Sequence, residues 1–189
     1  MELSIVEEAG MKSAIQGMAF SFQTECKLKD LKDLTMKDID RAFALCKLDG
    51  GHNKFLESIM VWIDIRASLK MWKQLDTYRV GVTKQSKSTM HTIMRKYLTY
   101  KDFDAPVSTQ VLTELNNAIE ENEFEKVCDN LPSSFLQTRR VCLNYKAIRN
   151  IIKQRRTHKL PEWQQLCEFF FTNLQYPGLL GLPRTTGTN

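Results

Sequence analysis

The chain has 189 residues, of which 42% are hydrophobic and 26% are charged, and its formal net charge is +5. This composition excludes a disordered chain and is typical of a globular protein with a substantial core. No apolar run reaches the roughly 18 residues of a membrane span. The start MELSIVEEAG is acidic and lacks the basic and apolar regions of a signal peptide. We therefore expect a cytoplasmic protein with no membrane partner.

The cysteines and the charge distribution narrow the kind of site. Five scattered cysteines form no CxxC pair, so we expect reduced thiols and no metal site. Basic residues are concentrated over 139–159 and acidic residues over 114–129. No Lys/Arg run forms a polybasic tail. A local site for a small anion is therefore favoured over a nucleic-acid track, with an RNA- or DNA-binding role for the 139–159 face as the weaker alternative.

The predicted elements follow from periodicity, caps and turn residues. Strands are expected over 3–7 and 55–65, and a loop over 79–88. The expected helices cover, in chain order, 12–22, 36–48 with Thr35 as its cap, 68–78 with Ser68 as its cap, 90–97, 106–119, a long helix following Ser133-Ser134 through Arg155, and 162–174, which Pro161 opens. The predicted strands lie in the first part of the sequence and helices dominate the second part, without regular βαβ alternation, which predicts an α+β fold. We expect one domain over 1–176 and a mobile tail over 177–189.

The segment 131–155 carries the most chemical information. On a helix, Asn144, Ile148, Ile151 and Arg155 project to about the same side. An amide, two apolar residues and a guanidinium suit a flat heterocycle with carbonyl oxygens, because Asn both donates and accepts and Arg offers a fixed fork of donors. The competing interpretation is an amphipathic helix whose polar groups face water.

The same segment resembles the C-terminal signature of the flavin-dependent thymidylate synthases (ThyX). In that family, Leu-Pro is followed, thirteen residues after its Leu, by N-x-R-x-L-x-N-F-x-x-x-R. Here Leu131-Pro132 is followed at matching spacing by Asn144, Lys146, Ile148, Asn150, Ile151 and Arg155. Farther along, Pro161-Glu-Trp-Gln164 is similar to the family's A-Q-W-E.

Two earlier segments agree in order and spacing. His52-Asn-Lys-Phe-Leu-Glu57 resembles the family's H-x-x-P-F-E, and Gln74 falls 22 residues after His52, where the family has an Arg-Gln pair. The residues from Ala14 to Phe22 are similar to its A-A-R-V-S-F helix. The resemblance covers about residues 3 to 172.

The resemblance implies a central antiparallel sheet flanked by helices, a homotetramer, and flavin-dependent methylation of dUMP, or a related one-carbon transfer to a pyrimidine nucleotide. Arg155 would be the catalytic residue that polarises the pyrimidine. The implied nucleotide-binding residues are Gln74, Gln85, Ser86, Ser88 and Arg155. The implied cofactor is FAD, with NADPH and methylene-tetrahydrofolate, and the residues along the flavin would be His52, Tyr78, Arg79, Asn144, Lys146 and Asn150.

The flavin and phosphate motifs are eroded. The family's Arg-His-Arg is Thr77-Tyr78-Arg79 here, its S-x-N-E-x-S-x-R-Y is Val82 through His91, and the Arg before Leu-Pro is Cys128. Lys84 through Ser88 still offers ammonium and hydroxyl donors, and Gly81 allows backbone amides to approach an oxyanion. Loss of charge-assisted hydrogen bonds weakens cofactor binding. A catalytically inactive nucleotide-binding or interaction protein, of viral or phage-like origin, is therefore the alternative hypothesis.

Overall fold

The computed structural model describes residues 1–22 and 34–184, and these divide into two compact units. Unit 1 comprises Met1–Ser4, Asp64–Arg79 and Lys84–Val141, and unit 2 comprises Ile5–Ile63, Val80–Thr83 and Cys142–Asn189. Each unit is described by itself. Cys26 and the tail over 185–189, for which we expected a reduced thiol and mobility, lie outside the described residues. The prediction of one domain over 1–176 stays a prediction.

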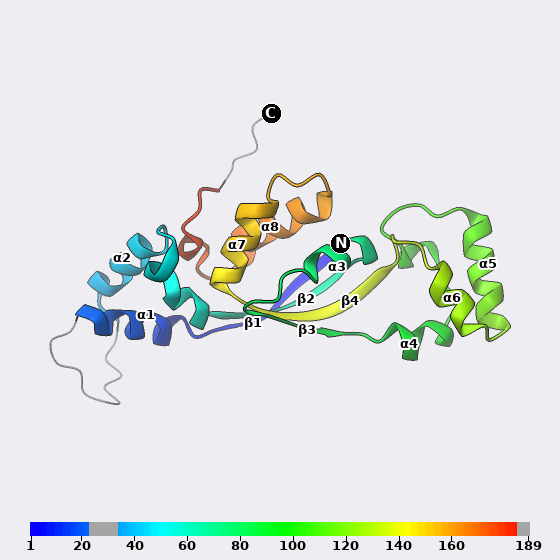
Figure 1. The fold of residues 1–189 in the computed structure, drawn as a ribbon, viewed down its shortest axis with the longest axis horizontal. Coiled ribbons are helices and arrows are strands. Elements are labelled where there is room, and N and C mark those ends of the chain that lie inside the picture. The colour runs from blue at the N-terminus through cyan, green and yellow to red at the C-terminus, as the bar shows by residue number, and fades with distance from the viewer. Residues whose placement is uncertain (23–33, 185–189) are drawn as a thin grey trace. The chain divides into compact units, whose positions relative to one another are not determined.

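Four strands form an antiparallel sheet in the order β1-β2-β4-β3 (Figure 1). They are β1 (Glu2–Ala9), β2 (Met60–Ser68), β3 (Val82–Ser86) and β4 (Leu136–Asn144). Along β2, burial alternates, so that Val61, Ile63 and Ile65 are fully buried while the residues between them are partly exposed. One face of this strand therefore packs into the core. The α+β fold class is confirmed.

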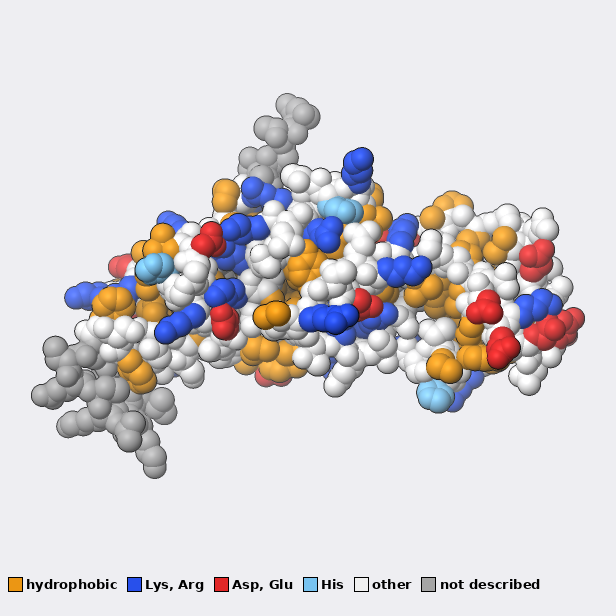
Figure 2. Space-filling view, in the orientation of Figure 1, with side chains coloured by type: hydrophobic (Ala, Val, Ile, Leu, Met, Phe, Trp, Pro, Cys, Tyr) orange, Lys and Arg blue, Asp and Glu red, His pale blue; other side chains and the backbone are white. Residues whose placement is uncertain are grey.

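Unit 1 contains a small helical core beside its strand segments. Its helices are α3 (Leu69–Leu75), α4 (Thr89–Thr92), α5 (Thr109–Glu120) and α6 (Phe124–Asn130), with 3-10 turns at Ile93–Arg95 and Tyr100–Asp102. Helices α5 and α6 lie side by side (Figure 1). They bury Leu115, Ala118 and Val127 against Ile93 and Phe135. Several acidic side chains lie over the part of the molecule that contains α5 and α6 in Figure 2.

Unit 2 contains the helices nearest both ends of the described chain. These are α1 (Met11–Ala19), α2 (Met36–Leu45), α7 (Tyr145–Arg155) and α8 (Pro161–Asn173), with 3-10 turns at Phe20–Phe22, Gly50–Ser58 and Pro177–Leu180. Helices α7 and α8 pack together (Figure 1). Ile148, Ile151, Trp163 and Phe170 are fully buried. Apolar side chains on both helices are therefore part of the core of unit 2.

Helix starts agree with their predicted caps. The Thr35 hydroxyl accepts a hydrogen bond from the Asp38 amide and forms a capping box with its carboxylate. The Ser68 hydroxyl accepts from the amide of Met71. Pro161 occupies the first turn of α8, where its missing N–H costs nothing. Helices at 36, 69 and 161 are therefore confirmed.

Several predicted elements are wrong. Residues 136–144 form the strand β4 instead of the first half of a long helix, and 82–86 form β3 within the predicted loop. The segment 55–58 is a 3-10 turn, with β2 beginning only at Met60, and the helix predicted over 90–97 ends at Thr92. The residues 177–180 form a 3-10 turn that buries Leu179 and Leu180, and the predicted mobility of the tail stays a prediction. Sheet pairing outweighs local propensity at 82–86 and 136–144.

Tyr145 opens α7 and ties it to the first strand. Its hydroxyl donates to the Glu8 carboxylate and accepts from the Tyr176 amide at 3.3 Å. Burial first, and Glu8 second, raise the pKa of the Tyr145 phenol far above its usual value. A raised pKa in the folded state means that the stability it provides is complete below about pH 10 and is lost as the pH rises further.

Tyr145→Phe should therefore reduce the loss of folding stability that occurs as the pH rises above about 10. It should cost about 1–3 kcal/mol at neutral pH, because Glu8 and the Tyr176 amide lose a buried partner. Urea unfolding of both proteins at pH 7 and above pH 10 measures the two effects. If both proteins lost the same amount of folding stability above pH 10, the Tyr145 phenol would not be the group that causes the loss.

Among the residues the structure describes, no helix is long and apolar enough to cross a membrane. Within the same residues, no group of three His, Cys, Asp or Glu side chains is placed to hold a metal ion.

Candidate functional site

Three of the predicted cofactor residues line one cleft in unit 2. Asn144, Lys146 and Asn150 come from the end of β4 and from α7, and the cleft has a volume of about 660 Å³. Residues of the turn Gly50–Ser58, together with Val80 and Gly81, line the same cleft. Lys and Arg side chains gather over the part of the molecule that contains α7 (Figure 2). Asn144 and Asn150, although six positions apart, thus lie on one wall because α7 begins directly at the end of β4.

The cations of this cleft are held by two carboxylates. Lys146 Nζ lies 2.6 Å from Glu57 Oε1, and Arg149 and Lys153 both bond to Asp49, at 2.7 and 3.0 Å. The hydrogen bonds from Lys153 and Arg149 hold the pKa of Asp49 below its usual range. Three cations against two carboxylates leave the wall with a net charge of +1. The cleft is therefore preorganised and mildly attractive to an anion.

Two residues that line the same cleft carry unpaired polar atoms. Asn53 Oδ1 and Arg149 Nε are buried and have no hydrogen-bond partner, although both residues line the cleft. Buried polar atoms normally have partners. One unsatisfied acceptor, the amide oxygen, and one unsatisfied donor, the guanidinium nitrogen, suit a polar ligand better than an apolar one.

Gly81 approaches Asn144 closely. The Asn144 side chain caps α7 by accepting from the Ala147 amide at 2.8 Å. Gly81 has φ +68°, and a Cβ there would lie 2.5 Å from Asn144 Nδ2. Gly81 therefore supports the amide wall of the cleft. Its predicted part in approaching an oxyanion stays a prediction.

His52 lines a second cleft of unit 2, of about 660 Å³, between α1 and the turn Gly50–Ser58. Ser13, Ser21 and Phe22 line it as well. Glu57 lines both clefts and is the functional candidate that sequence reasoning missed. Its signal was present, since Glu57 ends the segment that resembles H-x-x-P-F-E.

Arg155 occupies the last turn of α7 and is not one of the residues that line the first cleft. Its guanidinium carbon lies 5.0 Å from the centre of the fully buried Trp163 ring. His158 meets the same ring edge-on, with ring centres 6.4 Å apart. The expected single stripe of Asn144, Ile148, Ile151 and Arg155 is not observed, because Asn144 precedes the helix and both isoleucines are fully buried. The indole instead supports the guanidinium by a cation–π contact.

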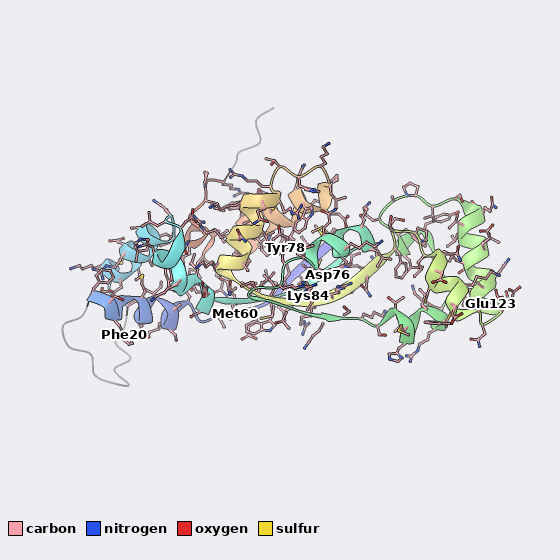
Figure 3. All side chains as sticks on the ribbon, in the orientation of Figure 1. Phe20, Met60, Asp76, Tyr78, Lys84 and Glu123 are labelled. Atoms are coloured by element: carbon pink, nitrogen blue, oxygen red, sulfur yellow. The ribbon has the colours of Figure 1, made fainter. Side chains whose placement is uncertain are left out.

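Unit 1 brings Tyr78 and Lys84 together beside Asp76 (Figure 3). Lys84 Nζ donates to the Tyr78 carbonyl at 2.8 Å and lies 3.7 Å from Asp76 Oδ1. Arg139 bonds to the same Asp76 at 2.9 Å and lies over the Trp72 ring at 4.4 Å. Burial lowers the pKa of the Lys84 ammonium, while Asp76 opposes that change. The single carboxylate of Asp76 therefore pairs with two cations, and the three charged groups keep a net charge of +1.

The remaining residues that were predicted to bind the nucleotide lie on different elements, and some of them are exposed. Gln74 is part of α3, and its carbonyl accepts from the Thr77 hydroxyl. Gln85 and Ser86 are exposed on β3, as is Arg79 before it. Ser88 caps α4 through its hydroxyl, which accepts from the His91 amide. Gln74, Gln85, Ser86 and Ser88 all belong to unit 1, whereas Arg155 belongs to unit 2.

The fold is that of the flavin-dependent thymidylate synthases. A crystal structure of ThyX from Helicobacter pylori complexed with FAD and dUMP matches with a TM-score of 0.77 at 18% identity, covering 95% of this chain and 98% of that chain. A second structure of Helicobacter pylori ThyX with FAD and dUMP matches with a TM-score of 0.78 at 18% identity, over 95% and 97% of the two chains. No family model and no curated protein sequence matches the chain. At this identity the likeness shows the fold, as the sequence resemblance implied.

Proposed function

We propose that this chain is a ThyX-like enzyme that methylates a pyrimidine nucleotide of the dUMP type in a flavin-dependent reaction. The observation that carries the proposal is the cleft of unit 2, where Asn144, Lys146 and Asn150 stand together at the spacing of the family signature. The shared fold with structures that hold FAD and dUMP supports it.

The residues of the cleft suit a flavin nucleotide. The cleft has a net positive wall, amide donors and acceptors, and two buried polar atoms without partners. Asn144, Lys146 and Asn150 would hold the cofactor, whose polar ribityl and phosphate groups need such donors. When bound, FAD supplies the hydride for the reaction, with NADPH as its reductant and methylene-tetrahydrofolate as the carbon source.

Arg155 would act on the pyrimidine. A guanidinium keeps its proton, so it can donate to an imide oxygen and favour the deprotonated ring without itself losing charge. The contact with Trp163 restricts the rotamers of the Arg155 side chain and lowers the entropy lost on binding. With this activity we propose a cytoplasmic homotetramer.

Arg155→Lys tests the role of the guanidinium. Nucleotide-stimulated NADPH oxidation should fall about 10²–10³-fold, because an ammonium lacks the planar fork of donors. The matched control is Lys159→Gln, an exposed cation four residues farther along, which should leave the rate unchanged. Equal rates for Arg155→Lys and the control would overturn the assignment of Arg155.

The visible spectrum of the purified protein tests the cofactor. A yellow protein that loses flavin absorbance when Asn150 is replaced by alanine supports the proposal. The control is Asn117→Ala, at an exposed asparagine within α5, which makes the same change in helix propensity and should leave the absorbance unchanged.

A colourless protein that still binds dUMP would support the inactive nucleotide-binding alternative. One observation favours that alternative. Asp76 directly precedes Thr77-Tyr78-Arg79, which replaces the family's Arg-His-Arg, and it already pairs with Lys84 and Arg139.

A further inference from the structure

His158 lies in the connection between α7 and α8 and joins the end of one helix to the start of the other. Its amide donates to the Arg155 carbonyl at 2.9 Å, and its own carbonyl accepts from Gln164 Nε2 at 2.9 Å. Its ring Nδ1 accepts from the Leu160 amide at 3.0 Å. The backbone and the side chain of this half-buried residue thus fix the path of the chain between the two helices.

The start of α8 depends on the hydrogen bond to the His158 ring, because this helix lacks an ordinary cap. Leu160 is the N-cap residue, and its aliphatic side chain makes no capping hydrogen bond. Pro161 follows it and has no N–H to donate. Proline also restricts the residue before it to an extended backbone, and Leu160 has φ −77° and ψ 117°. With its backbone extended and its amide bonded to His158, Leu160 sets the direction in which α8 begins.

Trp163 stands in the first turn of α8, so the start of the helix also determines where its indole lies. The Trp163 amide donates to the Leu160 carbonyl at 3.1 Å. The indole is fully buried and meets the His158 ring edge-on, with ring centres 6.4 Å apart. The Arg155 guanidinium carbon lies 5.0 Å from its centre. A cation–π contact requires the cation within about 6 Å of the ring centre, so a shift of the indole would move the guanidinium that it supports.

The hydrogen bond also fixes the chemical state of the imidazole. A ring nitrogen that accepts from an amide carries no proton, so the Nδ1 acceptor requires neutral His158 with its proton on Nε2. A neutral ring places no second positive charge against the indole that supports Arg155.

We propose that His158 is a positioning residue for Arg155. Its Nδ1 acceptor fixes the first turn of α8, and through Trp163 it holds the guanidinium in the orientation that a pyrimidine nucleotide requires. This inference rests on the proposed function, in which Arg155 acts on the pyrimidine. Loss of the acceptor should therefore change nucleotide affinity and rate only through Arg155.

Two substitutions separate the acceptor from the ring. In His158→Asn the side-chain oxygen can accept from the amide two residues farther along, as in an Asx turn, but the ring is lost. In His158→Phe a ring can still meet Trp163 edge-on, but the Leu160 amide loses its acceptor. The control is Thr157→Ala, at an exposed position in the same connection. Circular dichroism checks that each variant is folded.

Titration with dUMP and nucleotide-stimulated NADPH oxidation measure the effect on Arg155. His158→Phe should weaken dUMP binding and lower kcat, each about tenfold, because the guanidinium is no longer held in place for the pyrimidine. His158→Asn and Thr157→Ala should stay within about twofold of the unmodified protein, since one keeps the hydrogen bond and the other changes only the surface. Equal behaviour of His158→Asn and His158→Phe, or a loss confined to His158→Asn, would overturn the inference.

Hydrogen exchange of the Leu160 and Trp163 amides tests the same geometry without any ligand. Exchange should be about tenfold faster or more in His158→Phe and unchanged in His158→Asn, because only the first loses the acceptor. If dUMP binding depends on Arg155 but is unaffected in His158→Phe, this inference fails while the proposed function stands. If Arg155→Lys itself leaves dUMP binding and the rate unchanged, the proposed function fails, and this inference fails with it.

Discussion

Gly10→Ala should destabilise unit 2 by about 2–5 kcal/mol. Gly10 joins β1 to α1 with φ +93°, a conformation that costs an L-residue about 1–2 kcal/mol. A Cβ at this position would overlap the backbone carbonyl of Ser58, and the backbone shift that relieves such overpacking costs a further 1–3 kcal/mol or so. The free energy of unfolding in urea measures the sum.

Gly17 provides the control within the same helix. It lies inside α1, and a Cβ there would meet no atom within 4 Å. Gly17→Ala should therefore stabilise the protein by roughly 0.5–1 kcal/mol, through lower backbone entropy in the unfolded chain. If both substitutions changed stability by the same amount and sign, the close approach of Gly10 to Ser58 would be disproved.

Trp163→Ala should cost about 3–5 kcal/mol, because it removes a large, fully buried side chain from the packing of α7 and α8. It should also release Arg155 from its indole support. Urea unfolding gives the loss of stability, and nucleotide titration of the folded protein gives the loss of affinity.

Trp163→Phe separates these two effects. Phenylalanine fills most of the site, so the stability loss should be smaller, whereas the weaker quadrupole of its ring reduces the cation–π contact with Arg155. A nucleotide affinity that is lowered in a nearly stable Trp163→Phe protein would connect the indole to the function of Arg155. An unchanged affinity in both variants would show that Trp163 serves only the core.

Local signals predicted the parts of the fold that local chemistry controls. Thr35, Ser68 and Pro161 mark helix starts because each satisfies or removes backbone donors within one turn. The alternation at the N-terminus likewise predicted β1 over most of its length. These elements need no knowledge of distant residues.

The error at 136–144 has a non-local cause. This segment lies between β2 and β3 in the sheet, and its backbone groups are satisfied by strands that are distant in sequence. Val141 and Leu143 are buried while Cys142 between them is partly exposed, which is a period of two. The helical period of 145–155 directly follows the strand period of 136–144. When the two stretches are treated as one segment, the boundary between the two periods is lost and the whole segment is predicted as a helix.

The candidate site was predictable where it follows a contiguous motif. Asn144, Lys146 and Asn150 do line one cleft, because a strand end and a helix start fix their positions locally. The ion pairs of Lys146 with Glu57 and of Arg149 with Asp49 join residues about 90 to 100 positions apart. Neither pair has a signal in one sequence, since nothing local indicates which carboxylate meets which cation.

The contact between Gly81 and Asn144 has an evolutionary consequence. The amide caps α7 and the glycine leaves room for it, so neither position can change freely without the other. Among homologues of this chain, the two positions should covary. A lineage that replaced Asn144 with serine or aspartate would remove the close contact at position 81, while φ +68° would still favour glycine or asparagine there. Covariation should therefore be strongest when position 81 alternates between these two residues.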